Sequence, residues 1–146
     1  MTFPQTEQVD SVAASSRIAA SAMRAQSARL RIISENIANA ETTSNVAGGD
    51  PYARKTITFR EELDRNTGAD LVAVRDIGTD RTPFEIAYDP GHPAADAQGY
   101  VKKPNVHLLI ELADMQEATR AYSANVQMIK FARTLSSMTI DLLRTS

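Results

Sequence analysis

The residues in this chain that come nearest to a metal site are a histidine and two carboxylates. Asp89, His92 and Asp96 lie in one short segment, and imidazole nitrogens and carboxylate oxygens are common metal ligands. The same segment, Asp89-Pro-Gly-His-Pro, is also typical of a tight turn. Neither His92 nor His107 has a cysteine or an H-E-x-x-H pattern beside it. We therefore interpret His92 as a turn residue and His107 as a solvated residue at a helix start, and expect no metal and no cofactor.

The sequence contains no other catalytic pattern. Glu61, Glu62 and Asp64 form a charged run, which we interpret as solvated rather than as an acid–base pair. Gly48 and Gly49 stand outside any phosphate-binding motif, and no serine lies in a G-x-S-x-G context. The chain has no cysteine, which excludes thiolate nucleophiles and disulfides. These observations predict a protein without catalytic residues that is not an enzyme.

Composition and charge indicate which kinds of partner this chain does not bind. A chain of 146 residues suits one domain, and an aromatic share of 5% allows only a modest core. The net charge of −2 gives no general attraction to nucleic acid or to an anionic membrane. The arginines that would have to contact phosphate have no aromatic residues interleaved with them; they are Arg17, Arg24, Arg29 and Arg31. We expect no nucleic-acid binding.

We expect neither a cleaved targeting segment nor a membrane anchor in this sequence. Residues 1–10 have neither a basic stretch nor an apolar stretch, so they do not resemble a cleaved signal peptide. No apolar run approaches the roughly 18 residues of a membrane span. We expect no direct membrane insertion.

The residues between Val12 and Ala40 predict one long helix. Apolar and small residues recur there at alternating spacings of four and three, which is the period of a helix that packs along a second helix. These residues are Val12, Ser16, Ala19, Met23, Gln26, Leu30, Ile33, Ile37 and Ala40. Pro4 precludes an earlier start and Asp10 or Ser11 would cap the helix, while residues 1–10 are frayed. The turn-forming run from Thr42 to Pro51 ends it.

A β-rich segment follows. Alternating residues predict strands at 52–59, 71–77, 84–88 and 99–102, and the charged residues 61–70 predict a loop or a short helical turn. Together they form a small antiparallel unit, which is marginally stable unless it packs on another element.

A second long helix is predicted from Asn105, its cap, to the end of the chain. Its apolar residues keep a near-heptad rhythm: Leu108, Leu112, Met115, Tyr122, Val126, Ile129, Leu135, Met138 and Leu142. Acidic residues gather in its first half and basic residues in its second half. Antiparallel pairing of the helices would bring Arg29 and Arg31 near Asp114 and Glu117, and Asp10 near Arg133.

The predicted fold is therefore α+β, with two long terminal helices forming an antiparallel coiled-coil-like hairpin around a small, mostly β domain. We divide the chain into an N-terminal helix (1–42), a β-rich insertion that begins with a flexible loop (43–104) and a C-terminal helix (105–146). Because the helix seams are rich in alanine and serine, an isolated hairpin buries little apolar area. This favours assembly into a larger helical bundle, although a self-contained coiled-coil hairpin remains open.

Four stretches of the chain resemble the bacterial flagellar axial proteins, and within them the C-type proximal rod subunits. The first resembles the signature S-x-N-[LI]-A-N-A-x-T. The others are typical of the proximal-rod subtype, and all four occur in the same order as in that family. They are residues 22–42, Pro51-Tyr-Ala-Arg-Lys, Tyr88 to Val106 and Ala118 to Val126.

The resemblance implies a non-enzymatic structural subunit of the proximal rod. Such a subunit passes through the flagellar type III export apparatus without a cleaved signal peptide and assembles in the periplasm into the drive shaft that transmits motor torque. Its partners would be that apparatus, the other rod subunits and copies of itself. A stable soluble coiled-coil adaptor or export chaperone is the alternative, which would form a small discrete oligomer instead.

The resemblance also implies which residues pack at helix contacts. In the first helix they are Leu30, Ile33, Ser34, Asn36, Ile37, Ala38, Asn39, Ala40 and Thr42, and in the second Tyr122, Ala124, Asn125, Val126 and Ile129. The asparagines would donate and accept hydrogen bonds there, and the alanines, Ala121 among them, would permit close approach. The chain departs from the family pattern in three places. Position 103 is Lys where an apolar residue is usual, and the residues before Arg17 and around 62–70 match the pattern poorly.

Overall fold

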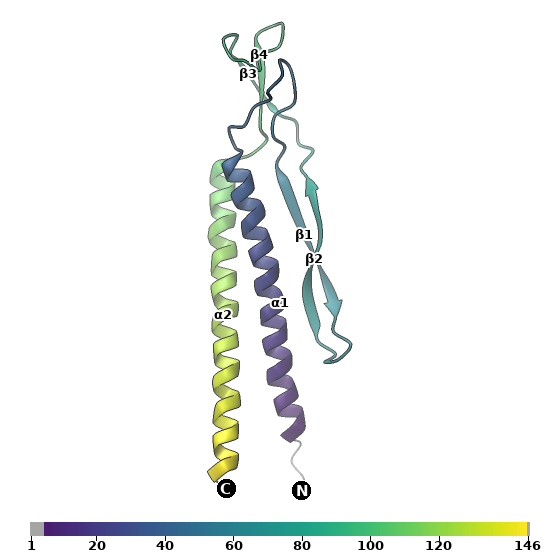
Figure 1. Ribbon diagram of the computed structural model, residues 1–146, viewed down its shortest axis with the longest axis vertical. Coiled ribbons are helices and arrows are strands. Elements are labelled where there is room, and N and C mark those ends of the chain that lie inside the picture. Colours follow the sequence, from purple (N-terminus) through teal and green to yellow (C-terminus); the bar gives the residue numbers. More distant parts are fainter. Residues whose placement is uncertain (1–4, 146) are drawn as a thin grey trace. The chain divides into compact units, whose positions relative to one another are not determined.

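The structure is a computed structural model that describes residues 5–145. Its elements, in chain order, are α1 (Gln5–Ala38), β1 (Lys55–Leu63), β2 (Asp70–Thr79), β3 (Glu85–Tyr88), β4 (Tyr100–Lys103) and α2 (Leu108–Thr145) (Figure 1). The predicted α+β class, with two long helices on either side of a β-rich insertion, is confirmed.

The chain divides into two compact units, and each contains part of both helices. Unit 1 comprises residues 1–28, 59–75 and 118–146. Unit 2 comprises residues 29–58 and 76–117. The predicted division into 1–42, 43–104 and 105–146 follows the chain rather than its contacts, and it stays a prediction.

The first helix begins earlier than predicted. It starts at Gln5 rather than Val12, so the predicted capping by Asp10 or Ser11 is wrong, as is the fraying of residues 5–10. Residues 5–11 contain neither glycine nor proline that would break a helix. Residues 1–4, including Pro4, lie outside the described part. The helix ends at Ala38, where Asn39 and Thr42 form a turn through a 3.0 Å bond from the Thr42 N–H to the Asn39 carbonyl.

The second helix begins later than predicted. Its first turn is closed by bonds of 2.9 Å and 3.0 Å from the Ile110 and Glu111 N–H groups to the carbonyl oxygen of His107. His107 is exposed, as expected. Asn105 therefore does not cap α2, because its side chain is engaged by other parts of the backbone.

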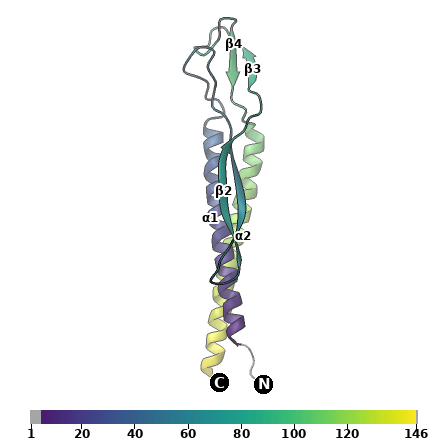
Figure 2. The same ribbon diagram turned by 90° about the vertical axis from the view of Figure 1, so that its right-hand side faces the viewer.

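The strands form two separate two-stranded sheets instead of one β unit. β1 pairs with β2, and β3 pairs antiparallel with β4 with Tyr88 opposite Tyr100. β1 extends to Leu63, through residues that the charge run predicted as loop. The turn that follows is closed by a 2.8 Å bond from the Asp64 N–H to the Ala69 carbonyl, and Gly68 has a φ of 66°. Figure 2 shows the β1–β2 hairpin from its outer side.

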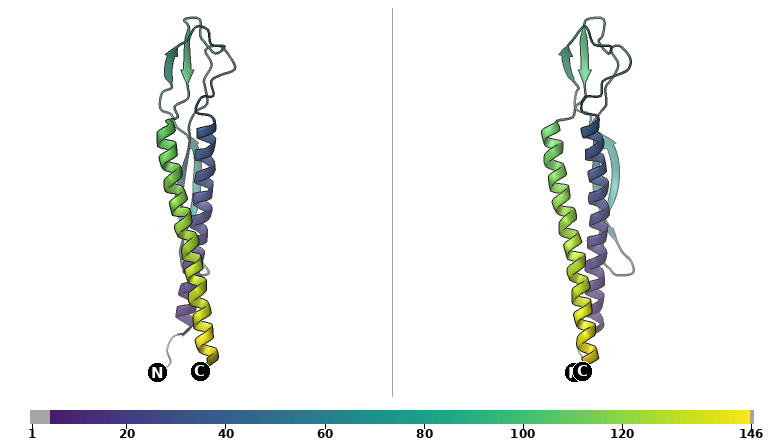
Figure 3. Two further views of the ribbon diagram at one scale, coloured as in Figure 1. Left: turned by 90° about the vertical axis from the view of Figure 1, so that its left-hand side faces the viewer. Right: turned by 60° about the vertical axis from the view of Figure 1, so that its left-hand side comes forward.

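In each unit the segments of α1 and α2 run side by side in opposite directions (Figures 1 and 3). In unit 2, Arg29 lies 3.6 Å from both Asp114 and Glu117, which confirms the predicted pairing for this arginine. Arg31 makes no such ion pair in the described part of the chain. The predicted pair of Asp10 with Arg133 involves a side chain outside the described residues.

The buried residues of the two units differ in kind. Those of unit 1 are all small: Ala19, Ser21, Ala25, Ala118 and Ala132. In unit 2, Ile32, Ile33, Ala94 and Val101 are buried, but so are polar side chains, with Asn36 and Glu111 both 0% exposed. The predicted α2 seam is wrong at both of its ends. Leu108 and Leu112 at its start are 48% and 41% exposed, and Leu135, Met138 and Leu142 at its end are 39%, 57% and 71% exposed. Small Ala132 takes the inward position instead.

α1 packs on two of its faces. One face has the predicted spacing of four and three residues, and Ala19 and Ile33 on it are buried. The other carries Ser21 and Ala25, against β2, and Asn36, against the start of β1. Two packed faces on one helix require small residues, which accounts for the alanine and serine content of the seam.

Within residues 5–145, neither helix is apolar over a long enough stretch to cross a membrane.

We predict that Gly99→Ala destabilises unit 2 by about 1–3 kcal/mol, because an alanine at a positive φ is strained. Gly99 has a φ of 85°, and an added Cβ would lie 3.0 Å from both Pro90 and Tyr88. Urea unfolding followed by tyrosine fluorescence measures the change. Gly91→Ala is the control, since its added Cβ would meet only Asp89 at 3.6 Å; equal stability of the two variants would contradict the prediction.

Candidate functional site

A buried asparagine of α1 pairs with the backbone of β1 in unit 2. The Asn36 Oδ1 accepts a 2.8 Å bond from the Lys55 N–H, and its Nδ2 donates a 2.9 Å bond to the Lys55 carbonyl. The side-chain amide thereby takes the place of a strand residue beside Lys55. The Tyr52 hydroxyl donates a second bond of 2.8 Å to the same Oδ1. A side-chain amide carries two N–H donors and a carbonyl acceptor in one plane, which matches the bonds that Asn36 makes here.

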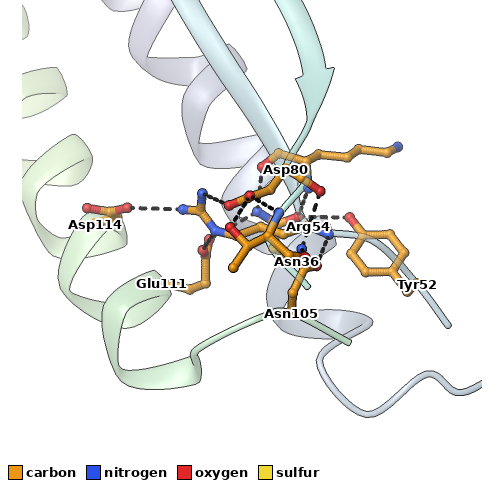
Figure 4. A network of polar contacts seen from close by, with 9 residues as sticks. Asn36, Tyr52, Arg54, Asp80, Asn105, Glu111 and Asp114 are labelled. Carbon is orange, nitrogen blue, oxygen red and sulfur yellow. Dashed lines mark hydrogen bonds and ion pairs between the residues drawn. The ribbon is translucent and has the colours of Figure 1, made fainter. Parts of the chain in front are cut away.

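The remaining donor of Asn36 connects it to a buried ion pair. Its Nδ2 lies 3.1 Å from Oε2 of Glu111, whose Oε1 accepts a 2.6 Å bond from Nε of Arg54. The Arg54 guanidinium also lies 3.6 Å from Asp80 and 3.8 Å from Asp114 (Figure 4). Glu111 is fully buried, whereas the Arg54 side chain is 24% exposed. The carboxylate is therefore stabilised by a charge-assisted bond that it cannot exchange for water.

A second asparagine fixes the other side of the same strand start. The Asn105 Oδ1 accepts a 2.8 Å bond from the Arg54 N–H. Its Nδ2 donates to the carbonyl oxygens of Asp80 and Thr82, at 3.3 Å and 2.9 Å. Asn36, Tyr52, Arg54, Asp80, Asn105 and Glu111 thus form one connected set, which we call the polar network. It joins α1, the start of β1, the segment after β2 and α2 within unit 2.

The electrostatics around the polar network follow from these contacts. Hydrogen bonds from the Thr82 hydroxyl and N–H lower the pKa of Asp80, with Arg54 adding to the shift. A hydrogen bond from Lys55 lowers the pKa of Glu35 and correspondingly raises that of Lys55. Burial raises the pKa of Tyr52, whose hydroxyl donates to Asn36. The arrangement holds these polar groups in fixed positions.

Unit 1 carries a different feature, an exposed apolar stripe along α2. Met128, Phe131, Leu135, Met138 and Leu142 recur at spacings of three and four, and their exposed fractions run from 39% to 71%. Residues with this period lie on one face of a helix. We call this set, with exposed Ala124 at its beginning, the apolar stripe. Contiguous exposed apolar surface is a common feature of interaction sites.

The residues predicted to pack at helix contacts have unequal environments. Ile33 and Asn36 are buried. Leu30, Ile37, Asn39, Ala40, Tyr122, Asn125, Val126 and Ile129 are half-buried, and Ser34, Ala38, Thr42 and Ala124 are exposed. Of the predicted set, only Asn36 belongs to the polar network.

Several of these polar side chains bond within their own segment. Asn125 donates a 2.8 Å bond to the Ala121 carbonyl, and Ser34 donates one of 2.8 Å to the Leu30 carbonyl. The Thr42 hydroxyl lies 3.1 Å from Oδ1 of Asn39. Their predicted role at contacts between helices stays a prediction.

The alternative of a metal at His92 has no support in the described residues. No group of three or more histidine, aspartate or glutamate side chains there is placed to hold a metal ion. The Nδ1 of His92 accepts a 3.0 Å bond from the Ala94 N–H, and Oδ1 of Asp96 accepts bonds from the Gln98 and Tyr100 N–H groups. Both side chains stabilise the turn, as their sequence context indicates.

The sequence reasoning missed most of the polar network. Arg54 and Tyr52 belong to the family-like stretch Pro51-Tyr-Ala-Arg-Lys, and Asn105 to the next one, but their contacts were not foreseen. Glu111 is one of the acidic residues that gather in the first half of the second predicted helix, and it is given no separate role in the sequence analysis. Its position between Leu108 and Met115, on the apolar side of α2, is the signal that could have identified it.

Comparisons with known proteins identify related sequences over almost the whole chain. The family described as "Flagella basal body rod protein" matches residues 17–47, and "Flagellar basal body rod FlgEFG protein C-terminal" matches residues 97–142. The flagellar basal-body rod protein FlgC of Agrobacterium fabrum is 54% identical over 138 residues, covering 94% of this chain and 99% of that protein. FlgC of Salmonella typhimurium is 34% identical, covering 86% and 92%. FlgC of Borreliella burgdorferi is 34% identical, covering 87% and 94%.

We predict that Asn36→Asp destabilises unit 2 by about 2–5 kcal/mol, because it removes both donors and places a carboxylate beside buried Glu111. Denaturant unfolding measures the loss. Asn45→Asp is the matched control, since Asn45 is exposed in the same unit. A similar small effect in both variants would mean that the paired amide contributes little.

The polar network also predicts a pH dependence. Because the pKa of Asp80 is lower in the folded state than in the unfolded chain, its contribution is present at neutral pH and is lost as the pH falls below about 4. Asp80→Asn should therefore give a shallower loss of stability on acidification. Thermal unfolding at a series of pH values tests this, and an unchanged acid slope would contradict it.

Proposed function

We propose that the apolar stripe is a surface by which rod subunits bind one another. The proposal proceeds from the family, since the chain belongs to the FlgC family of flagellar basal-body rod proteins and is a structural subunit of the basal-body rod. The observation that carries the proposal is the exposure of Met128, Phe131, Leu135, Met138 and Leu142 along one face of α2. Burying each such side chain contributes about 1.5–3 kcal/mol. The partners would be other rod subunits and copies of this chain.

The small residues inside unit 1 support this proposal. A helix pair whose buried side chains are alanine and serine gains little from its own packing, because the free energy of burial scales with apolar area. Further burial of the apolar stripe against a neighbouring subunit would supply what the isolated helix pair lacks. The predicted contact residues Tyr122, Asn125, Val126 and Ile129 would then keep the helix pair in register beneath that contact.

The polar network would have a separate role in the assembled rod. It fixes the start of β1 to both helices within unit 2 through a fully buried carboxylate. A subunit that transmits motor torque must not change shape under stress, and a connected set of directional bonds resists shear better than apolar packing alone. We propose that unit 2 keeps the subunit rigid while torque is transmitted, and that it does so without any catalysis.

The route to the rod is also part of the proposal. The resemblance that places the chain in this family implies passage through the flagellar type III export apparatus without a cleaved signal peptide, and assembly in the periplasm. The alternative of a soluble adaptor or export chaperone is not favoured, because the relatives that match almost the whole chain are rod proteins.

We predict that Phe131→Asp abolishes rod assembly without unfolding the subunit. Phe131 is 59% exposed, so the charge is solvated in the free chain but costs several kcal/mol in an apolar contact. Swimming of a strain that carries only the variant measures assembly, and circular dichroism of the purified variant measures folding.

Ser137→Asp is the matched control, because Ser137 is exposed on a different face of the same helix. It should support swimming. Normal swimming with Phe131→Asp would overturn the proposed surface. A small, discrete and stable oligomer of the purified wild-type chain in light scattering would favour the adaptor instead.

A further inference from the structure

The part of the β1–β2 hairpin in unit 1, residues 59–75, is weakly packed. We call this segment the arm. Each of its residues is half-buried or exposed, and Leu63 near its end is 60% exposed. A two-stranded hairpin is marginally stable by itself in water. The arm therefore depends on what holds it to α1.

Among the residues that the structure describes in unit 1, two polar contacts attach the arm to α1. The Val72 N–H donates a 3.0 Å bond to Oγ of Ser21, which is 1% exposed. Nearer the turn, the Arg17 guanidinium lies 2.8 Å from Asp64. The Arg17 side chain is 53% exposed, and an exposed ion pair contributes at most about 1 kcal/mol. The buried bond at Ser21 is therefore the principal polar attachment.

The apolar packing between the arm and α1 is incomplete. An open groove of about 290 Å³ lies between them, lined by Ser21, Arg24 and Ala25 of α1 and by Glu62 and Leu71 to Val74 of the arm. Side chains that face a groove lose dispersion contacts on that side. Lifting the arm consequently removes fewer contacts than its length suggests.

The segments that precede and follow the arm are held firmly within unit 2. Asn36 occupies the N–H and carbonyl of Lys55, and the Asp80 N–H donates a 2.7 Å bond to the Arg54 carbonyl. The Thr58 hydroxyl donates to the Asp76 carbonyl at 3.4 Å. An opening of the arm would therefore stop at residues 58 and 76.

We infer that the arm is a detachable strap, which opens from α1 as one cooperative segment while the helices and the polar network stay folded. Opening exposes Ser21 and Ala25, which are only 1% and 3% exposed in the closed form. Segments with few buried contacts and an accessible hydrogen-bonded backbone open at low free energy. The Ser21–Val72 bond sets the equilibrium between the closed and open forms.

Native-state hydrogen exchange of the purified full chain tests this inference. Amides of residues 59–75 should exchange together. Their protection factors should be at least about tenfold lower than those of Val101 in β4 and of Glu111 in α2. Ser21→Ala should accelerate exchange at Val72 and the rest of the arm by about five- to tenfold, as expected for the loss of one buried hydrogen bond.

Ser34→Ala is the matched control, because exposed Ser34 donates a bond to the Leu30 carbonyl of its own helix, away from the arm. It should leave exchange in the arm unchanged. The inference is overturned if the arm is as protected as β4, or if Ser21→Ala accelerates exchange equally in α2 and β4. The latter result would mean that the arm opens only when the whole chain unfolds.

Discussion

The fold of unit 2 depends on one pairing, in which the side-chain amide of Asn36 occupies both backbone groups of Lys55. This contact places the start of β1 against α1. It also brings Arg54, which directly precedes Lys55, to buried Glu111 of α2. Glu111 is acceptable in the interior only because both of its oxygens are bonded. Two long helices and a strand are therefore joined through directional bonds, where a domain of this size would more commonly use apolar side chains.

The two units divide the requirements on a rod subunit between them. Unit 2 has polar groups whose hydrogen bonds connect both helices to the start of β1. Unit 1 has a thin interior of alanine and serine and carries its larger apolar side chains on the outside of α2. Its interior suits close helix pairing, and its outer face suits contact with another chain. In the proposal made above, unit 2 would provide a defined shape and unit 1 would provide cohesion between subunits.

The sequence predicted the features that depend on periodicity and charge. Both long helices, the β-rich insertion and the pairing of Arg29 with Asp114 follow from patterns along the chain. The polar network could not be predicted in this way, because the contact between Asn36 and Lys55 depends on how the chain returns after the turn. Asn105 looked like a helix cap because asparagine is common there, but three backbone groups elsewhere compete for its amide. Leu135 and Met138 have the period of a buried seam, and periodicity cannot tell an inner face from an outer one.

The amide of Asn36 also occupies backbone groups at the edge of the β1–β2 sheet. A strand that ends a small sheet leaves N–H and carbonyl groups to which a foreign strand can add, and proteins at high local concentration are exposed to aggregation by that route. At Lys55 those groups are occupied by a helix side chain, so the beginning of β1 offers no template. A foreign strand that added to β1 at this point would first have to displace the amide of Asn36 from Lys55.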